Sequence, residues 1–230
     1  MMQRDAYDEL NKWELYKAYG HFNLAFEDLV ACFRSFIVEL VKVYYGFNVD
    51  WEDAETTHEL EGHLQDRLIK IILSDSGASD ILEKWRACIK DMSNQDVQKV
   101  LIENDVEPLA FSKNQIMLVD LVYKKSLELI RLRNVIIHSH YYGVNLDFHP
   151  SDKLQGVKGI KRSGGFQEKR FRLKSKNFGD YIESIERLYI VVNEFQNNIL
   201  SRNEDWFPDK SEFEAIEKIE FTINEQENDS

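Results

Sequence analysis

Residues 22–45 read FNLAFEDLVACFRSFIVELVKVYY and carry the strongest helical signal in the chain. Apolar side chains recur there at steps of three and four, which is the spacing of one buried face of an α-helix. Those side chains belong to Phe26, Leu29, Val30, Phe33, Phe36, Ile37, Leu40, Val41 and Tyr44. Because Arg34, Glu39 and Lys42 interrupt the apolar run, it does not predict a membrane span. The pattern predicts a long helix that is buried on one side by other helices.

The rest of the sequence is also typical of a helical protein. Its 230 residues include only 3 prolines and 10 glycines, too few breakers for a β-sandwich with many tight turns. Two more long amphipathic helices are expected at 114–141 and 178–201. Shorter helices are expected at 5–19, 58–74, 79–92 and 94–104. Ser79 and Asn94 suit the N-caps of the last two. We predict an all-α, up-and-down helical bundle with additional short helices.

One segment between the last two long helices departs from this pattern. Six of the ten glycines lie within residues 143–179, Ser163-Gly164-Gly165-Phe166 suits a hairpin turn, and residues 170–174 alternate like a strand. We therefore expect a small β-hairpin, at about 151–176, inserted in a helical domain of residues 1–202. The remaining residues, 203–230, form an acidic tail whose aromatic side chains favour docking.

The charge of the chain is unevenly distributed. The formal net charge of −12 by itself argues against nucleic-acid binding. The hairpin stretch 151–176, however, holds nine basic and only two acidic side chains. The hairpin residues that we expect to bind substrate are Lys161, Arg162, Lys169, Arg170 and Arg172. These cations can belong to a solvated hairpin that has no role in binding. Alternatively, the hairpin is an arm that binds phosphate groups.

Several common kinds of site are not indicated. Cys32 and Cys88 form no Cys-x-x-Cys pair, which excludes a zinc ribbon and a redox motif. His58 and His63 are five residues apart, about 140° around a helix, whereas zinc chelation from one helix face needs a spacing of four. No nucleotide-binding or nucleophile motif is present, so no metal or cofactor is expected. The N-terminus has no apolar signal core, and the expected compartment is the cytoplasm, without a membrane partner.

The residues most suited to chemistry lie at the end of the long helix expected at 114–141. Residues 131–143 read RLRNVIIHSHYYG and place two arginines, an asparagine and two histidines close together. A guanidinium can hold a phosphate through two hydrogen bonds and stabilise its developing charge. A histidine can take or give a proton near neutral pH. Together these groups suffice for metal-free cleavage of RNA, because the neighbouring 2′-hydroxyl is a built-in nucleophile.

Arg133-Asn134-x-x-x-His138, at the end of a long bundle helix, resembles the HEPN superfamily of nucleotide-binding domains. The hallmark of that family is an arginine followed after four to six residues by a histidine, often with a polar residue directly after the arginine. Arg133, Asn134 and His138 match these three positions, so the resemblance implies that they are catalytic. It covers roughly residues 15–45 and 114–201.

The spacing leaves open which arginine pairs with the histidine. On a regular helix Arg133 and His138 point about 140° apart, whereas Arg131, Asn134 and His138 share a face within about 60°. Either the helix kinks just before His138, or Arg131 is its closer partner. The family pattern favours Arg133, and Arg131 is the second candidate. The alternative is that the motif has no catalytic role. The two arginines then complement the helix dipole, and His138 caps the end of the helix.

The resemblance implies a function for this motif. HEPN proteins are α-helical bundles, often homodimers whose two motifs face each other across the interface to form a composite active site. Active members are metal-independent endoribonucleases that leave a 2′,3′-cyclic phosphate and a 5′-hydroxyl. Many act as toxins or in anti-phage defence, beside an antitoxin or another defence partner protein. In that pattern His138 is the general base or acid, Arg133 holds the scissile phosphate, Asn134 orients one of them, and His140 is expected to contact substrate.

Two other functions fit the sequence. A HEPN-like bundle can bind RNA, nucleotide or a partner protein without cleaving anything. An unrelated helical adaptor would instead use its acidic tail to recruit a basic partner. RNA cleavage that depends on His138 distinguishes the first function from both of these.

Overall fold

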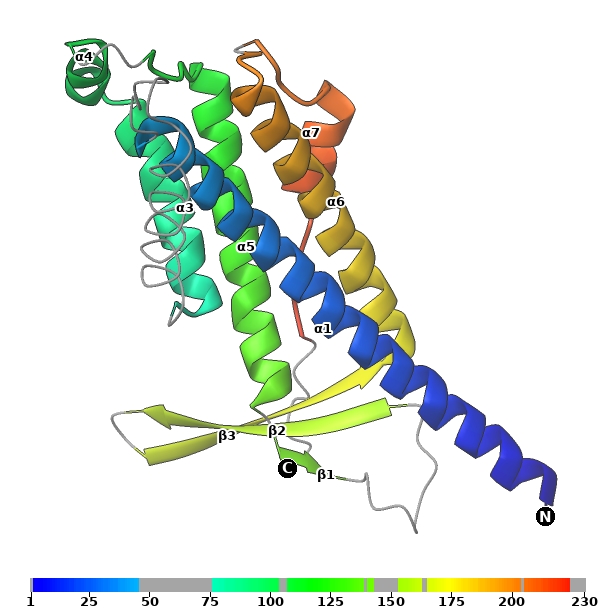
Figure 1. Cartoon of the computed structure of the whole chain (residues 1–230). Coiled ribbons are helices and arrows are strands. Elements are labelled where there is room, and N and C mark those ends of the chain that lie inside the picture. The colour runs from blue at the N-terminus through cyan, green and yellow to red at the C-terminus, as the bar shows by residue number, and fades with distance from the viewer. Residues whose placement is uncertain are drawn as a thin grey trace, which may run out of the picture. The chain divides into compact units, whose positions relative to one another are not determined.

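The computed structural model describes residues 2–45, 76–103, 107–138, 140–142, 153–162, 165–203 and 205–223. Over these residues the chain is mostly helical, with a three-stranded antiparallel sheet that comes between α5 and α6 in the sequence (Figure 1). The elements are α1 (Met2–Tyr45), α3 (Ala78–Met92), α4 (Gln95–Glu103), α5 (Lys113–Ile137), β1 (His140–Tyr142), β2 (Lys153–Arg162), β3 (Gly165–Lys174), α6 (Ser175–Leu200) and α7 (Lys210–Glu217). The predicted all-α fold with an inserted hairpin is confirmed. The helix expected at 58–74 and the turn at residues 163 and 164 lie outside the described residues.

Several helix boundaries differ from the prediction. Helix α1 runs without a break through Gly20, where two separate helices were expected. Helix α5 ends at Ile137 rather than at residue 141, and β1 follows it. Helix α3 begins after Gly77, which makes no side-chain cap, so the expected Ser79 cap is wrong. The other expected cap is present, since the Asn94 side chain accepts a hydrogen bond from the Asp96 N–H at 2.9 Å.

Residues from distant parts of the chain combine into two compact units. Helices α1, α5 and α6 each contribute one part to each unit. The first unit contains Met1–Asp28, Lys125–Leu188 and Lys218–Ser230, and the second contains Leu29–Lys124 and Tyr189–Glu217. The end of α5 and the whole sheet therefore belong to the first unit.

Aromatic side chains of α1 and α6 form the core of the first unit. Phe22 and Phe178 are fully buried, with ring centroids 5.6 Å apart. Leu129 and Ile136 of α5 are buried in the same unit. Burying one such side chain stabilises the fold by about 1.5–3 kcal/mol. A glycine inside a helix costs only about 1 kcal/mol, which explains why α1 continues through Gly20.

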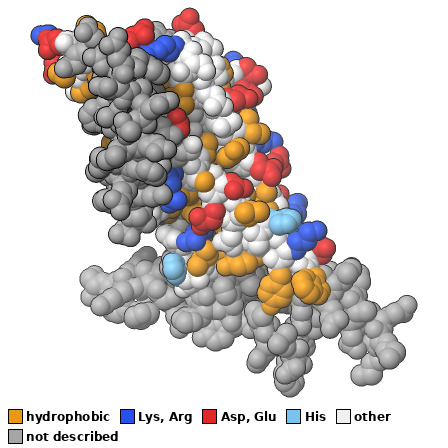
Figure 2. Space-filling view, viewed as in Figure 1, with side chains coloured by type: hydrophobic (Ala, Val, Ile, Leu, Met, Phe, Trp, Pro, Cys, Tyr) orange, Lys and Arg blue, Asp and Glu red, His pale blue; other side chains and the backbone are white. Residues whose placement is uncertain are grey.

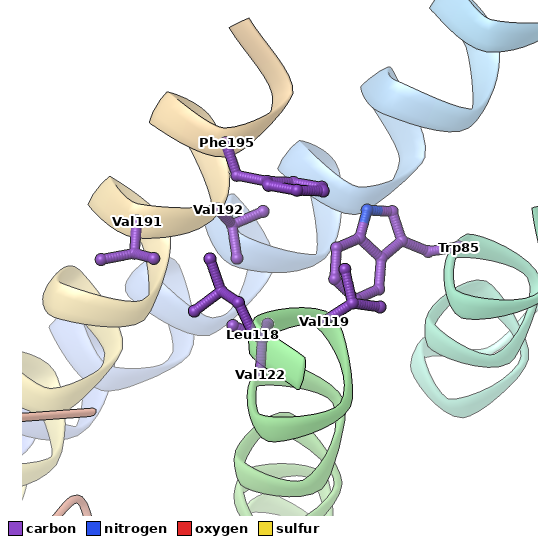
Figure 3. A pocket seen from close by; sticks show the side chains of 7 residues that line it. All are labelled: Trp85, Leu118, Val119, Val122, Val191, Val192 and Phe195. Atoms are coloured by element: carbon purple, nitrogen blue, oxygen red, sulfur yellow. The ribbon is translucent and has the colours of Figure 1, made fainter. Parts of the chain in front are cut away.

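The second unit is centred on Trp85 of α3. Its ring lies 4.8 Å from the Phe33 ring of α1 and 6.5 Å from the Phe195 ring of α6. Figure 3 shows how Trp85 and Phe195 converge with valine and leucine side chains of α5 and α6. The gap between these side chains is too small to hold a water molecule. This part of the second unit is therefore a packed core and not a ligand pocket.

A capping box sets the start of α5. The Gln115 side chain accepts a hydrogen bond from the Ser112 N–H at 2.8 Å, and the Ser112 hydroxyl accepts one from the Gln115 N–H at 3.2 Å. The amide group of Gln115 also donates to the Trp206 carbonyl at 2.9 Å. The sequence pattern Ser112-x-x-Gln115 could have located this helix start.

A segment of the acidic tail is docked in the first unit. The Lys125 Nζ donates to the Ile219 carbonyl at 2.5 Å, and the Tyr181 hydroxyl donates to the Thr222 carbonyl at 2.5 Å. Phe221 is buried, with its ring 6.4 Å from that of Tyr181. Residues 218–223 are thus held by two side-chain hydrogen bonds and an aromatic contact.

Removing the Tyr181 hydroxyl should loosen this segment. We expect Tyr181→Phe to lower the free energy of unfolding by about 1–2 kcal/mol, because it removes the hydrogen bond that the buried Tyr181 side chain donates to the Thr222 carbonyl. Hydrogen-exchange mass spectrometry should show faster exchange over residues 218–223. The matched variant Tyr189→Phe removes an exposed hydroxyl and should change neither quantity. Identical exchange in the two variants would contradict the anchoring role.

The stabilisation from this hydrogen bond should depend on pH only in the alkaline range. Burial, and next the charge of Asp180, raise the pKa of Tyr181 to about 12, above its ordinary value of 10. The stabilisation is therefore present below pH 10 and is lost as the pH rises toward 12.

Candidate active site

The predicted motif lies where α5 gives way to β1 (Figure 1). His138 directly follows Ile137, the last residue of α5, and its backbone N–H still donates to the Asn134 carbonyl at 3.2 Å. The helical hydrogen-bond pattern therefore continues unbroken to His138. Strand β1 begins only two residues later, at His140. The histidine is thus an exposed residue in the turn between a helix and a strand.

Arg131 and His138 lie together on the exposed side of this helix end. Regular helix geometry places Arg131, Asn134 and His138 within about 60° of one another. The exposure of these residues agrees with a shared face, since Arg131 and His138 are exposed and Asn134 is half-buried. Leu132 and Ile136 are buried, so the core lies on another side of α5. Because the helix is regular, the spacing gives His138 a face in common with Arg131.

Arg133 lies on a different side of α5 and contacts α1. Its Nη2 is 3.4 Å from the Glu27 Oε1, and its guanidinium carbon is 5.1 Å from the centre of the Phe26 ring. The Arg133 side chain is only 26% exposed, and its Nε is buried without a hydrogen-bond partner. These contacts hold the guanidinium against α1 rather than on the face that carries His138. Their geometry is that of a residue that positions α5, with part of its hydrogen-bonding capacity unused.

The sequence did not indicate Phe26 or Glu27 as partners of the motif. Phe26 was expected only as a member of the apolar stripe of the first helix. Glu27 is 60% exposed and belongs to no recognisable pattern. The pairing joins residues that are 106 positions apart, so only the packing of α1 against α5 reveals it.

The remaining candidate residues lie on the sheet that follows the motif. His140 in β1 pairs with Val157 in β2, and Val157 pairs with Arg170 in β3. These three residues therefore form one row across the sheet. The other hairpin candidates occupy positions on the same two long strands, at Lys161, Arg162, Lys169 and Arg172. All the hairpin candidates therefore lie on β2 or β3. Strand β2 pairs with β1, which begins two residues after His138, and β3 pairs with β2.

The described surface offers no assembled metal site. Within the described residues, no three histidine, cysteine, aspartate or glutamate side chains gather as metal ligands. The helices that the structure describes are also too short or too polar to cross a membrane. On the face drawn in Figure 2, acidic and basic side chains alternate with exposed hydrophobic ones.

Comparisons with known proteins found no match to a protein-family model, to a curated protein or to a solved structure. The residues at the end of α5 are therefore the basis on which a function can be assigned.

The two arginines should contribute differently to stability. Arg133→Ala should lower the free energy of unfolding by about 1–2 kcal/mol, because it removes the cation–π contact with Phe26 and the ion pair with Glu27. Arg131→Ala removes an exposed side chain and should change it by less than about 0.5 kcal/mol. Urea denaturation followed by circular dichroism measures both values. Equal losses in the two variants would show that the assignment of Arg133 to packing is mistaken.

Proposed function

We propose that this chain is a metal-independent endoribonuclease of the HEPN type, acting on RNA in the cytoplasm. The observation that supports it best is the exposed face that Arg131 and His138 share at the end of α5, with Asn134 half-buried beside them. An exposed cation and an exposed imidazole on one helix face can contact the same phosphate group. Arg133 belongs to the family motif, and its contacts with α1 support a positioning role in this mechanism.

The reaction needs only a base, an acid and a cation at the phosphate. His138 takes the proton of the 2′-hydroxyl, whose oxygen forms a bond to the adjacent phosphorus. The bond from phosphorus to the 5′-oxygen breaks, and that oxygen receives a proton from an acid. The products are a 2′,3′-cyclic phosphate and a 5′-hydroxyl. Arg131 stabilises the charge that builds on the phosphate oxygens, and Asn134 orients the imidazole or the phosphate.

A homodimer supplies the acid, because the His138 of a second copy can donate the proton. Exposed apolar side chains on α1 support this assembly. Trp13, Tyr16 and Leu24 are 74%, 46% and 62% exposed, and regular helix geometry places them within about 80° of one another. Glu27, which pairs with Arg133, falls within the same angular range. Such an apolar strip beside the motif suits an interface that brings two motifs together.

A second candidate function is a HEPN-like bundle that binds RNA or a partner protein without cleaving. The observation that favours it is the contact between Arg133 and Glu27, which occupies part of the guanidinium that the family uses for catalysis.

For the cleaving protein, we propose a role as a toxin or anti-phage effector that is silenced by an antitoxin or a defence partner.

Cleavage of RNA in the presence of EDTA is the decisive measurement. We expect the wild-type chain to cut single-stranded RNA and His138→Ala to be at least about 100-fold slower, as expected for the loss of a general acid or base. The matched control His21→Ala removes another exposed histidine of the first unit and should cleave normally. Mass spectrometry should detect 2′,3′-cyclic phosphate ends. Undiminished cleavage by His138→Ala would exclude the proposed mechanism, and binding without products would favour the second candidate.

The dimer has its own test. Leu24→Lys places a charge in the apolar strip of α1, so sedimentation velocity should show a monomer and RNA cleavage should fall. Ile190→Lys is the control, because Ile190 is 50% exposed but belongs to the second unit. A wild-type chain that stays monomeric at every concentration tested would rule out the composite site.

A further inference from the structure

The pairing of the three strands defines two faces of the sheet. Strands β2 and β3 pair without a skipped residue from Lys153 opposite Lys174 to Arg162 opposite Gly165. Strand β1 pairs with β2 in the same regular way. Successive residues of a strand lie on opposite faces, and paired residues lie on the same face. Every position of the sheet is therefore assigned to one of two faces by its register.

Two neighbouring residues at the end of β3 show how these faces differ. Leu173 is only 1% exposed, whereas Lys174 is exposed. The Lys174 backbone N–H donates to the Asn177 side chain at 2.9 Å, which ties this strand end to the start of α6. The face that contains Leu173 is therefore turned to the core of the first unit at this point. Lys174, on the other face, is turned to solvent at the same point.

We call the face that contains Lys174 the basic face. Its cationic positions are Lys153, Lys161, Arg170, Arg172 and Lys174. The single acidic position on it is Glu168. It also carries three positions with aromatic rings, at His140, Tyr142 and Phe166. The opposite face has three cationic positions, Lys158, Arg162 and Lys169, at the end of the hairpin away from Leu173.

The basic face is connected to the motif by a short path. His140 is two residues from His138, at most about 7 Å between Cα atoms. The row from His140 through Val157 to Arg170 adds two strand spacings, about 10 Å. Arg170 is thus within about 17 Å of His138, close enough for one RNA strand to contact both.

We propose that the basic face is a binding platform for single-stranded RNA that enters or leaves the proposed active site. Lysines and arginines on alternate strand positions can follow a phosphate backbone, while aromatic positions among them can stack on unpaired bases. Duplex RNA shows its bases and 2′-hydroxyls in a shallow groove and offers no free base to stack. The platform rests on the proposed ribonuclease function, and it assigns the substrate class to single strands.

The two faces allow a comparison at equal charge. The basic-face variant carries Lys161→Glu, Arg170→Glu and Arg172→Glu. The control variant carries Lys158→Glu, Arg162→Glu and Lys169→Glu on the opposite face of the same hairpin. The sequence alone grouped Arg162 and Lys169 with the substrate-binding candidates, but the register separates them from Lys161, Arg170 and Arg172, and the proposal assigns RNA contact to the basic face only. Both change the net charge equally, so long-range electrostatics alone would weaken both to the same extent. All variants carry His138→Ala, so that binding is measured without cleavage.

Fluorescence anisotropy with a labelled, unstructured oligoribonucleotide measures the affinity at several salt concentrations. We expect the basic-face variant to bind at least about 30-fold more weakly than its parent and to lose about 2 units of the salt-dependence slope, since about 0.7 is lost per phosphate contact with a single strand. The control variant should stay within about 3-fold. Equal weakening of the two variants would overturn the proposal, as would tighter binding of a duplex of the same sequence. If either variant fails to fold, the corresponding glutamine substitutions give the same comparison.

A cleavage assay with the same basic-face substitutions in a chain that keeps His138 separates the platform from the ribonuclease. Binding that depends on the basic face, in a wild-type chain that does not cleave, would reject the enzyme and retain the platform. Cleavage that depends on His138 but is indifferent to the basic-face substitutions would reject the platform and retain the enzyme.

Discussion

Helix α5 cannot continue through residues 140–142, because these residues pair with β2 as a strand. His140, Tyr141 and Tyr142 pair with Val157, Gly156 and Gln155. A residue cannot satisfy a helical and a strand hydrogen-bond pattern together, so the sheet limits how far the helix can extend. His138 is left in the turn between the two, exposed and next to the sheet. The same pairing brings the row of Arg170 close to the motif.

The packing of α5 against α1 divides the motif into two sides. Arg133 is half-buried between Phe26 and Glu27, whereas Arg131 and His138 share the exposed side. A guanidinium suits the first position because its planar face packs on an aromatic ring while its edge pairs with a carboxylate. A residue in that setting holds the end of the helix in place and is less available to bind a ligand from solution. In the proposed mechanism the phosphate is therefore assigned to Arg131, two residues before the arginine that the family pattern favours.

The helices could be predicted because their signal is local. The apolar spacing around Phe26 and Phe36 is set by helical periodicity, and both side chains are buried as expected. The hairpin could also be predicted, because glycines and alternation mark it within a few residues. Strand β1 was missed because three residues have no period of their own, and Tyr141 became part of a strand only through its partner Gly156. The pair of Arg133 with Glu27 was missed for the same reason, since it depends on which helix lies beside α5.

The residues of the predicted motif can be read from the sequence, whereas the side of α5 on which each of them lies depends on the packing. The grouping of arginines, asparagine and histidine was visible as a string of letters, and helical angles had already separated Arg133 from His138. What no spacing could decide was which side of α5 is covered by the core. That depends on the buried side chains of Leu132 and Ile136, and on α1.

The anchored segment 218–223 has a consequence for the order in which the protein folds. The first unit draws on residues before 29, on the end of α5 with the sheet, and on this late segment. During synthesis, Lys125 and Tyr181 cannot form these two hydrogen bonds until the carbonyls of Ile219 and Thr222 have left the ribosome. Contacts so distant along the chain also slow folding, because long loops must close first. The second unit is complete at Glu217, so the unit that carries the motif is the last to mature.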